Sequence, residues 1–333
     1  MKTPINDQQV VIDDCSKLGR LTRAHGHFAW ACAMAMAFTA VPQGQAAPYN
    51  GFDVSNAIIA TAQIRSGGPP RDGIPAIDRP QFVATGRVNY LRPDDLLVSV
   101  TMGDKTRAYP LRILVWHEIV NDQMAEQSFA VTYCPLCGTA MVFDRRINER
   151  TLTFGVSGLL YQSDMLMYDR QTESLWSQLA AQSVAGRQVK EKLVWLPSEH
   201  MTWAAWKEKH PQGEVLSLNT GYKRDYSGKA YAGYEEKPGT MFPVPTYRRD
   251  LATKEWVVGV IVEGVAKAYP LRRLPAGKTL RDQIKETALE ITYEPASQQV
   301  VVRKGEGGEA LPAVKVYWFA WQAFYPQTEL WKP

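Results

Sequence analysis

The chain has 333 residues, of which 45% are hydrophobic and 22% are charged, a composition typical of a globular protein with one large domain or two smaller ones. Lys and Arg (38) exceed Asp and Glu (34) by only four, and no run or stripe of basic residues occurs. The composition therefore argues against a protein that binds nucleic acid or an anionic membrane.

The segment at 1–46 has the pattern of a secretory signal peptide. Basic residues precede an uncharged apolar run at 28–41, and small residues follow up to Ala46. We predict cleavage after Ala46, an N-terminal extension at 47–79, and a periplasmic or secreted protein. The apolar run is short for a hydrocarbon layer about 30 Å thick. We therefore expect no stable membrane span after cleavage, with an uncleaved anchor as the alternative.

The chain contains an internal repeat. The motif Ala-Tyr-Pro-Leu-Arg at 108–112 recurs at 268–272. With the same offset and no gap, residues 98–137 and 258–297 are identical at 14 of 40 positions. We conclude that one structural unit occurs twice.

The hydrophobic pattern predicts the elements of this unit. Alternating and β-branched residues indicate strands, and wider spacing indicates short helices. In chain order we predict strands at 96–102, 129–133, 140–143, 152–156, 165–168 and 256–262, helices at 113–122 and 202–209, and a long loop at 221–238. The expected fold is a β-rich α+β fold, an internally duplicated β-unit with short helices. The first unit spans 80–235, and a shorter, degenerate second copy at 245–333 packs on it.

A comparison of the two copies separates residues for the fold from residues for chemistry. Residues kept in both copies, such as Tyr109 and Asp122, are predicted to serve the fold. Residues that occur in one copy only are freer to serve chemistry. Three reactive residues of the first copy are replaced in the second: Cys134 by Glu294, Cys137 by Ser297, and His117 by Gly277.

Cys134 and Cys137 are the only cysteines after the predicted leader. One pair of cysteines in a Cys-x-x-Cys spacing is not the disulfide framework of a small exported protein. The pair lies in a Cys-Pro-Leu-Cys-Gly segment between two predicted strands, which is typical of a metal-binding knuckle. Such a tight turn directs both sulfur atoms to one point, and Gly138 tolerates the positive φ angle that closes it.

The leading hypothesis is a metal site with redox chemistry. Cys134, Cys137 and His117 would form a three-ligand site with an open position, or His117 would act as a base beside the metal. Soft thiolates favour copper, and zinc or iron is also possible. The substrate would be a small molecule or a protein that the sequence does not identify. The alternative for His117 is a buried ring whose nitrogen atoms are satisfied by ordinary hydrogen bonds.

Two other hypotheses remain open. One is a thiol–disulfide oxidoreductase with Cys134 as the nucleophile and Cys137 as the resolving thiol. The thioredoxin pattern continues into a helix, however, whereas residues 140–143 predict a strand. The other is a non-enzymatic module that binds a glycan or a protein through Tyr and Trp side chains, with a merely structural cysteine pair.

The segment at 158–178 has no counterpart in the second copy. It is rich in aromatic and polar residues, and Tyr161, Asp164 and Trp176 belong to it. Together with Tyr133, these three residues are predicted to line a pocket beside the cysteines. Ordinary packing in the core is the alternative for the same side chains.

These motifs carry a family resemblance. The relevant segments are Ala-Tyr-Pro-Leu-Arg at 108–112, Trp-His-Glu-Ile-Val-Asn-Asp at 116–122, Thr-Tyr-Cys-Pro-Leu-Cys-Gly at 132–138, Tyr-Asp-Arg at 168–170 and Leu-Trp-Ser-Gln at 175–178. In these segments the chain resembles the family called domain of unknown function 3179, over roughly residues 73–330. The resemblance implies a mostly exported bacterial or archaeal protein, and it implies no particular activity or catalytic residue.

Overall fold

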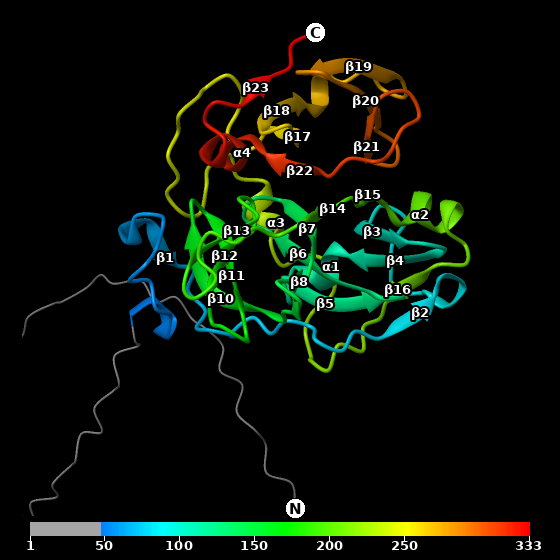
Figure 1. The fold of residues 1–333 in the computed structure, drawn as a ribbon. Coiled ribbons are helices and arrows are strands. Elements are labelled where there is room, and N and C mark those ends of the chain that lie inside the picture. The colour runs from blue at the N-terminus through cyan, green and yellow to red at the C-terminus, as the bar shows by residue number, and fades with distance from the viewer. Residues whose placement is uncertain (1–47) are drawn as a thin grey trace, which may run out of the picture. The chain divides into compact units, whose positions relative to one another are not determined.

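The computed structural model describes residues 48–333, and the predicted signal peptide lies outside the described residues. The described residues form one compact unit. Strands and a few short helices make up this unit, which confirms the predicted β-rich α+β fold (Figure 1). Within residues 48–333, every helix is too short or too polar to cross a membrane.

The duplication read from the sequence is visible strand by strand. Each strand of the repeated segment recurs at the offset of the Ala-Tyr-Pro-Leu-Arg motif with matching ends, and a short helical turn follows the second strand in each copy. The pairs are β3 (Leu96–Met102) and β17 (Trp256–Val262), β4 (Lys105–Pro110) and β18 (Val265–Pro270), α1 (Leu111–Leu114) and η4 (Leu271–Arg273), β5 (Ile119–Met124) and β19 (Thr279–Ile284), β6 (Gln127–Cys134) and β20 (Thr287–Glu294), and β7 (Thr139–Asp144) and β21 (Gln299–Lys304).

The repeat continues in a second stretch that the sequence reasoning missed. Here the offset between the copies is smaller, and the pairs are β15 (Glu199–Thr202) and β22 (Ala313–Tyr317), α2 (Trp203–Lys209) and α4 (Trp318–Phe324), and β16 (Glu214–Leu216) and β23 (Glu329–Leu330). β15 and β22 pair antiparallel with β3 and β17, and β16 and β23 pair parallel with β4 and β18. The signal in the sequence is Trp-x-x-Trp followed by Pro-Gln-x-Glu in both copies.

The smaller offset means that the first copy holds an insertion between its two stretches. This insertion carries β8 (Arg146–Ile147), β9 (Arg150–Thr151), β10 (Phe154–Tyr161), β11 (Asp164–Asp169), β12 (Leu175–Ser177), β13 (Gln182–Ala185) and β14 (Trp195–Leu196). β10 to β13 form an antiparallel sheet with β1 (Ile64–Ser66) on its edge. β14 instead extends the sheet of β5, β6 and β7.

The predicted helix at 113–122 is wrong over most of its length. The helix α1 ends at Leu114, and β5 begins at Ile119. β5 pairs with β6 along its whole length, and Val120 also forms a bridge with Ile77. Pairing in the sheet therefore overrides the local helical spacing. The other predicted helix, at 202–209, is present as α2, and the Thr202 hydroxyl accepts a hydrogen bond from the Ala205 N–H at its start.

The two copies contact each other reciprocally. The Thr202 N–H of the first copy donates to the Ser297 carbonyl of the second at 2.8 Å, and the Tyr317 N–H of the second donates to the Cys137 carbonyl of the first at 3.0 Å. Thr202 corresponds to Tyr317, and Ser297 corresponds to Cys137. The interface thus has the approximate two-fold character of a symmetric dimer, here within one chain. The second copy thereby covers the Cys-Pro-Leu-Cys turn.

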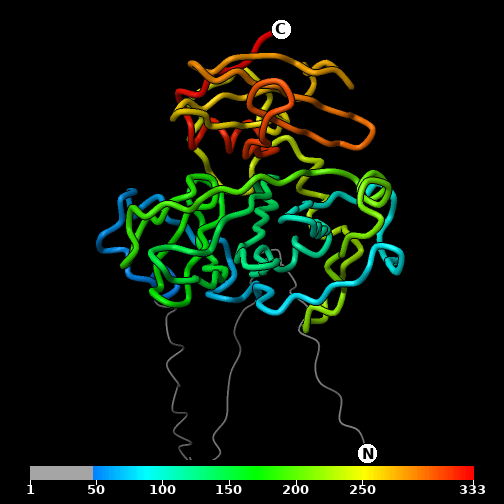
Figure 2. Tube along the Cα trace, turned by 45° about the vertical axis from the view of Figure 1, so that its right-hand side comes forward, coloured from blue at the N-terminus to red at the C-terminus, as the bar shows by residue number. Residues whose placement is uncertain are grey.

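The remaining elements join these parts. β2 (Phe82–Ala84) lies on the edge of an eight-stranded sheet, and β15 and β21 pair within that sheet so that both copies contribute to it. The short helix α3 (Ala232–Glu235) lies in the segment that was predicted as a loop. After α3 the chain passes from the first copy to the second, as the yellow segment of Figure 2 shows.

Candidate metal centre

The cysteines lie on a tight turn between β6 and β7. Cys134 ends β6 and pairs with Thr139 at the start of β7, so that residues 135–138 form the turn. Gly138 has a φ of +67°, as the sequence predicted. A Cβ atom on Gly138 would come within 2.3 Å of the Trp256 ring, which covers the turn from the second copy. The turn therefore requires glycine for its backbone conformation and for its packing.

Asp164 joins the two thiols in one group. The Sγ atoms of Cys134 and Cys137 and a carboxylate oxygen of Asp164 all lie within 4.8 Å of one another. The exposed fraction is 1% for Cys134 and 0% for Cys137 and Asp164, and both cysteines are free thiols. Asp164 was predicted as a pocket residue, and it instead completes a possible set of metal ligands.

The insertion brings Asp164 to this place. Asp164 is the first residue of β11, and the turn before it contains Gln162 and Ser163 with φ angles of +52° and +65°. Two successive positive φ angles are the geometry of a two-residue hairpin turn, and this turn joins β10 to β11. The Cys137 thiol donates to the Ser163 carbonyl at 3.2 Å, which ties the turn of the insertion to the turn of the cysteines.

The site contains buried acidic groups without a compensating cation among residues 48–333. Oδ2 of Asp164 accepts a hydrogen bond from the Leu179 N–H at 3.0 Å, whereas Oδ1 is closed off from solvent and has no hydrogen-bond partner within the same residues. Burial raises the pKa of Asp164 to about 7 and raises the pKa of both thiols. Burial and then the charge of Asp164 raise the pKa of Glu118 to about 8. A bound cation would relieve this arrangement, because metal ions displace the protons of such ligands.

The structure does not bring His117, the third predicted ligand, into this group. The ring is fully buried, its Nδ1 lies 2.8 Å from the Pro75 carbonyl, and its Nε2 lies 2.7 Å from the Tyr226 hydroxyl. Both nitrogen atoms thus have partners, as in the alternative interpretation of this residue. Asp164 replaces His117 as the third side chain beside the thiols.

Glu118 is the residue near the site that sequence reasoning missed. It is buried, with a positive φ of +56°, and its pKa responds to the charge of Asp164. The signal was present in the repeat, because position 118 is Glu in the first copy and the equivalent position 278 is Lys in the second. A reversal of charge at equivalent positions indicates that the first copy alone requires an acid there.

The three aromatic residues predicted to line a pocket are dispersed. Tyr133 lines a cavity of ≈ 530 Å³ between the two copies, together with Gly138. Trp176 is fully buried, and its Nε1–H donates to Asp169 at 3.0 Å. Tyr161 packs edge-on against Phe324 with ring centroids 5.4 Å apart. Trp176 and Tyr161 therefore have packing roles and do not line the cavity with Tyr133.

The comparisons with other proteins identify a family without an assigned activity. No curated protein and no solved structure matches the chain significantly. A family model matches residues 71–328, which is most of the chain and includes the cysteine turn, Asp164 and both copies of the repeat. The chain belongs to the family described as protein of unknown function (DUF3179).

Proposed function

We propose that the protein is an exported metal-binding protein that holds one ion on Cys134, Cys137 and Asp164. The observation that carries this proposal is the buried Oδ1 atom of Asp164, which has no hydrogen-bond partner within residues 48–333 and lies beside two buried thiols. A buried carboxylate oxygen without a partner is costly, and coordination of a cation would satisfy it. The pattern of residues 1–46 supports the export part of the proposal.

The donor set favours zinc. Thiolate and imidazole ligands would favour copper, but the third donor at this site is a carboxylate oxygen, which is a harder ligand than imidazole. Zinc accepts sulfur and oxygen donors in one tetrahedral site, whereas Cu(I) prefers soft donors alone. Three protein ligands would leave a fourth position open, as in zinc sites that bind water or a substrate. Iron is the second candidate, because it accepts the same donors.

The two competing hypotheses have less support. Thiol–disulfide exchange requires an exposed thiolate with a lowered pKa, whereas burial raises the pKa of Cys134 and Cys137 and removes them from solvent. A glycan-binding surface typically presents exposed aromatic rings. Within residues 48–333 no tryptophan is exposed, although Tyr222 and Tyr247 are. The remaining aromatic residues mostly pack in the core or between the copies.

The proposal is tested by elemental mass spectrometry on the full chain, produced with its leader and purified from the periplasm without a chelator. We expect about one zinc ion per chain. The variant Cys134→Ser/Cys137→Ser should contain no metal, and Asp164→Asn should contain much less than the wild type. His117→Gln is the matched control and should retain the ion, because His117 lies outside the ligand group. Absence of zinc, iron and copper from the folded wild type would contradict metal binding. Full retention of the ion in Asp164→Asn would contradict the assigned ligand set.

A further inference from the structure

The cavity of ≈ 530 Å³ lies between the two copies. Its lining includes both members of three equivalent pairs of residues. These pairs are His200 and Lys315, Gly138 and Gln298, and Leu96 and Trp256. In each pair the two copies place different side chains at the same position. The cavity therefore has two chemically different sides, although the backbone around it is repeated.

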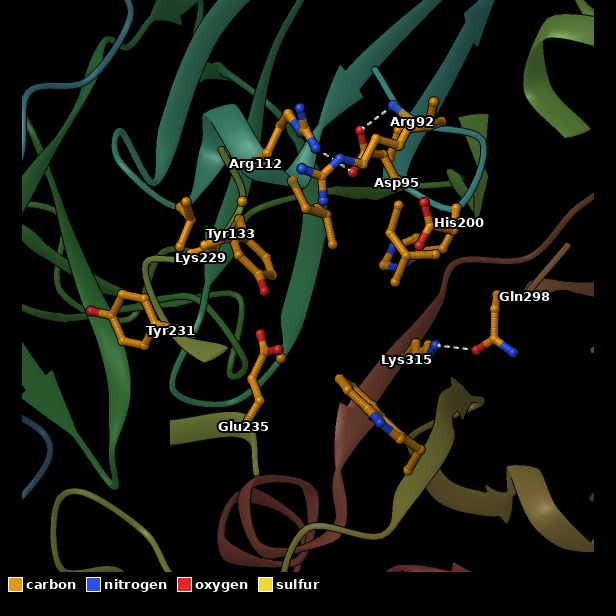
Figure 3. A pocket seen from close by; sticks show the side chains of 18 of the residues that line it. Arg92, Asp95, Arg112, Tyr133, His200, Lys229, Tyr231, Glu235, Gln298 and Lys315 are labelled. Carbon is orange, nitrogen blue, oxygen red and sulfur yellow. Dashed lines mark hydrogen bonds and ion pairs between the residues drawn. The ribbon is translucent and has the colours of Figure 1, made fainter. Parts of the chain in front are cut away.

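Lys315 provides a buried positive charge on one side of the cavity. The residue is 8% exposed, its Nζ donates to Oε1 of Gln298 at 3.0 Å, and it lies 4.8 Å from the centre of the Trp256 ring (Figure 3). It forms no salt bridge with any residue of 48–333. Buried lysines are rare unless an acidic group pairs with them, because desolvation of an ammonium group is costly.

The other buried cationic side chains of the described residues have partners that Lys315 lacks. Lys267 is 9% exposed, and its Nζ lies 2.7 Å from Asp282 and 3.6 Å from Glu329. Arg145 is also 9% exposed, and it donates to three backbone carbonyl groups. Both cations are thus compensated within the chain. Lys315 has one amide oxygen and one aromatic ring, so two of its three donor hydrogens have no polar partner among residues 48–333.

Further residues that line the cavity have unused hydrogen-bonding capacity. His200 Nε2, Arg112 Nε and Ser227 Oγ belong to residues that line the cavity, and each lacks a hydrogen-bond partner within residues 48–333. Nη2 of Arg112 pairs with Asp95 at 2.7 Å, which neutralises that carboxylate, and Nη1 donates to the Tyr90 carbonyl at 2.7 Å. Glu235 lies across the cavity from His200 and Lys315, beside Tyr133 (Figure 3). Lys315 and Glu235 therefore lie at different ends of the cavity.

We propose that this cavity binds a small organic anion whose carboxylate or phosphate group pairs with Lys315 and whose planar part lies against Trp256. The oxygen atoms of such a group are the acceptors that the ammonium lacks. Trp256 and Tyr317 offer apolar ring surfaces beside the charge, and their ring centroids lie 4.1 Å apart. Glu235 disfavours a second negative group at the far end of the ligand. This site is separate from the metal ligands, and its occupation does not depend on the metal proposal.

Isothermal titration calorimetry with benzoate and with inorganic phosphate, each on the full chain, tests the proposal. We expect the wild type to bind at least one probe with a Kd below about 10 mM, and the stronger probe identifies the preferred head group. Lys315→Met should weaken that binding by at least about tenfold, and circular dichroism checks that this variant remains folded. Glu235→Gln should strengthen binding, because it removes the opposing charge. The matched control is Lys267→Gln, which also removes a buried lysine charge but lies outside the cavity.

The binding affinities of the two lysine variants distinguish the possible outcomes. Binding that is lost in Lys315→Met and retained in Lys267→Gln supports the proposal. Equal binding by the wild type and by Lys315→Met overturns it, and so does equal loss in both lysine variants, because the effect would then follow net charge alone. Absence of binding of both probes to the wild type also overturns it.

Discussion

The two copies of the repeat share a backbone and differ in chemistry. In both copies a Tyr hydroxyl donates to an Asp on a nearby strand, from Tyr109 to Asp122 at 2.5 Å and from Tyr269 to Asp282 at 2.8 Å. The turn between β6 and β7 differs from its counterpart between β20 and β21, because Cys134 and its neighbours are buried whereas Glu294 is exposed. The repeated fold is therefore not sufficient to form the site.

The β6–β7 turn is buried, whereas the equivalent β20–β21 turn is exposed to solvent at Glu294. The insertion at β8–β14 covers the first turn from one side and supplies Asp164, and the second copy covers it with Trp256 and Tyr317. The equivalent turn of the second copy lacks an insertion, and its acidic residue Glu294 remains in water. A buried set of acids binds a cation strongly because the alternative is protonation or an unpaired charge.

The largest expected effect concerns the metal. Removal of the ion from the wild type by a chelator should lower the free energy of unfolding by about 4 kcal/mol if the ion is present at roughly a thousandfold excess over its Kd. Denaturant titration with and without the chelator measures this effect. In Cys134→Glu/Cys137→Ser, which places the residues of the second copy at both cysteine positions, the chelator should have no effect. An equal response of this variant and the wild type would show that the ion binds elsewhere.

The next effect concerns the glycine of the turn. Gly138→Ala should cost about 3 kcal/mol, because the new Cβ would meet the Trp256 ring and because φ is +67°. The equivalent residue Gln298 also has a positive φ, of +56°, yet already carries a side chain. Gln298→Ala should therefore meet no steric barrier, and its smaller cost of about 1.5 kcal/mol should come from the lost hydrogen bond with Lys315. Thermal unfolding of both variants checks the comparison, and equal losses would contradict the packing argument.

A smaller effect, with a defined dependence on pH, concerns Lys315. Burial lowers the pKa of Lys315 to about 8 from an ordinary value of 10.5. Between these values the unfolded chain binds one more proton than the folded chain, so stability should rise with pH across this window. Below pH 8 this shift corresponds to about 3 kcal/mol, of which the hydrogen bond that Lys315 donates to Gln298 offsets about 1 kcal/mol. Lys315→Met should therefore be more stable than the wild type by about 2 kcal/mol below pH 8, and the gap should close towards pH 10.5. Denaturant titrations at several pH values test this, and a gap that widens above pH 8 would contradict it.

The smallest expected loss of stability concerns a hydrogen bond present in both copies, and it should be equal in the two. Tyr109→Phe and Tyr269→Phe each remove one hydrogen bond to a carboxylate that retains its cation, Arg107 or Lys267. Each variant should lose about 1 to 2 kcal/mol, measured by chemical denaturation. A large difference between the two losses would show that this shared pair has also acquired a special role in one copy.

The repeat, most of its strands and the cysteine turn could be predicted from the sequence alone. Strands such as 96–102 and 256–262 follow from alternation along a short segment, and Gly138 follows from local turn geometry. These features depend on neighbours in the chain, so they are readable without a structure. The same locality explains the failure at 113–122, where pairing in the sheet overrides the local spacing.

Which side chains come into contact depends on the tertiary structure. Asp164 reaches the thiols because the insertion folds back on the turn, and His117 is directed instead to Pro75 and Tyr226. Lys315 comes from β22 of the second copy, far along the chain from the first-copy residues Asp95 and Arg112 that line the same cavity. The pKa of a group depends on its burial and on which charged groups lie near it in space. The same contacts decide whether the group has a hydrogen-bond partner. These quantities arise from packing and are not written in any local pattern of residues.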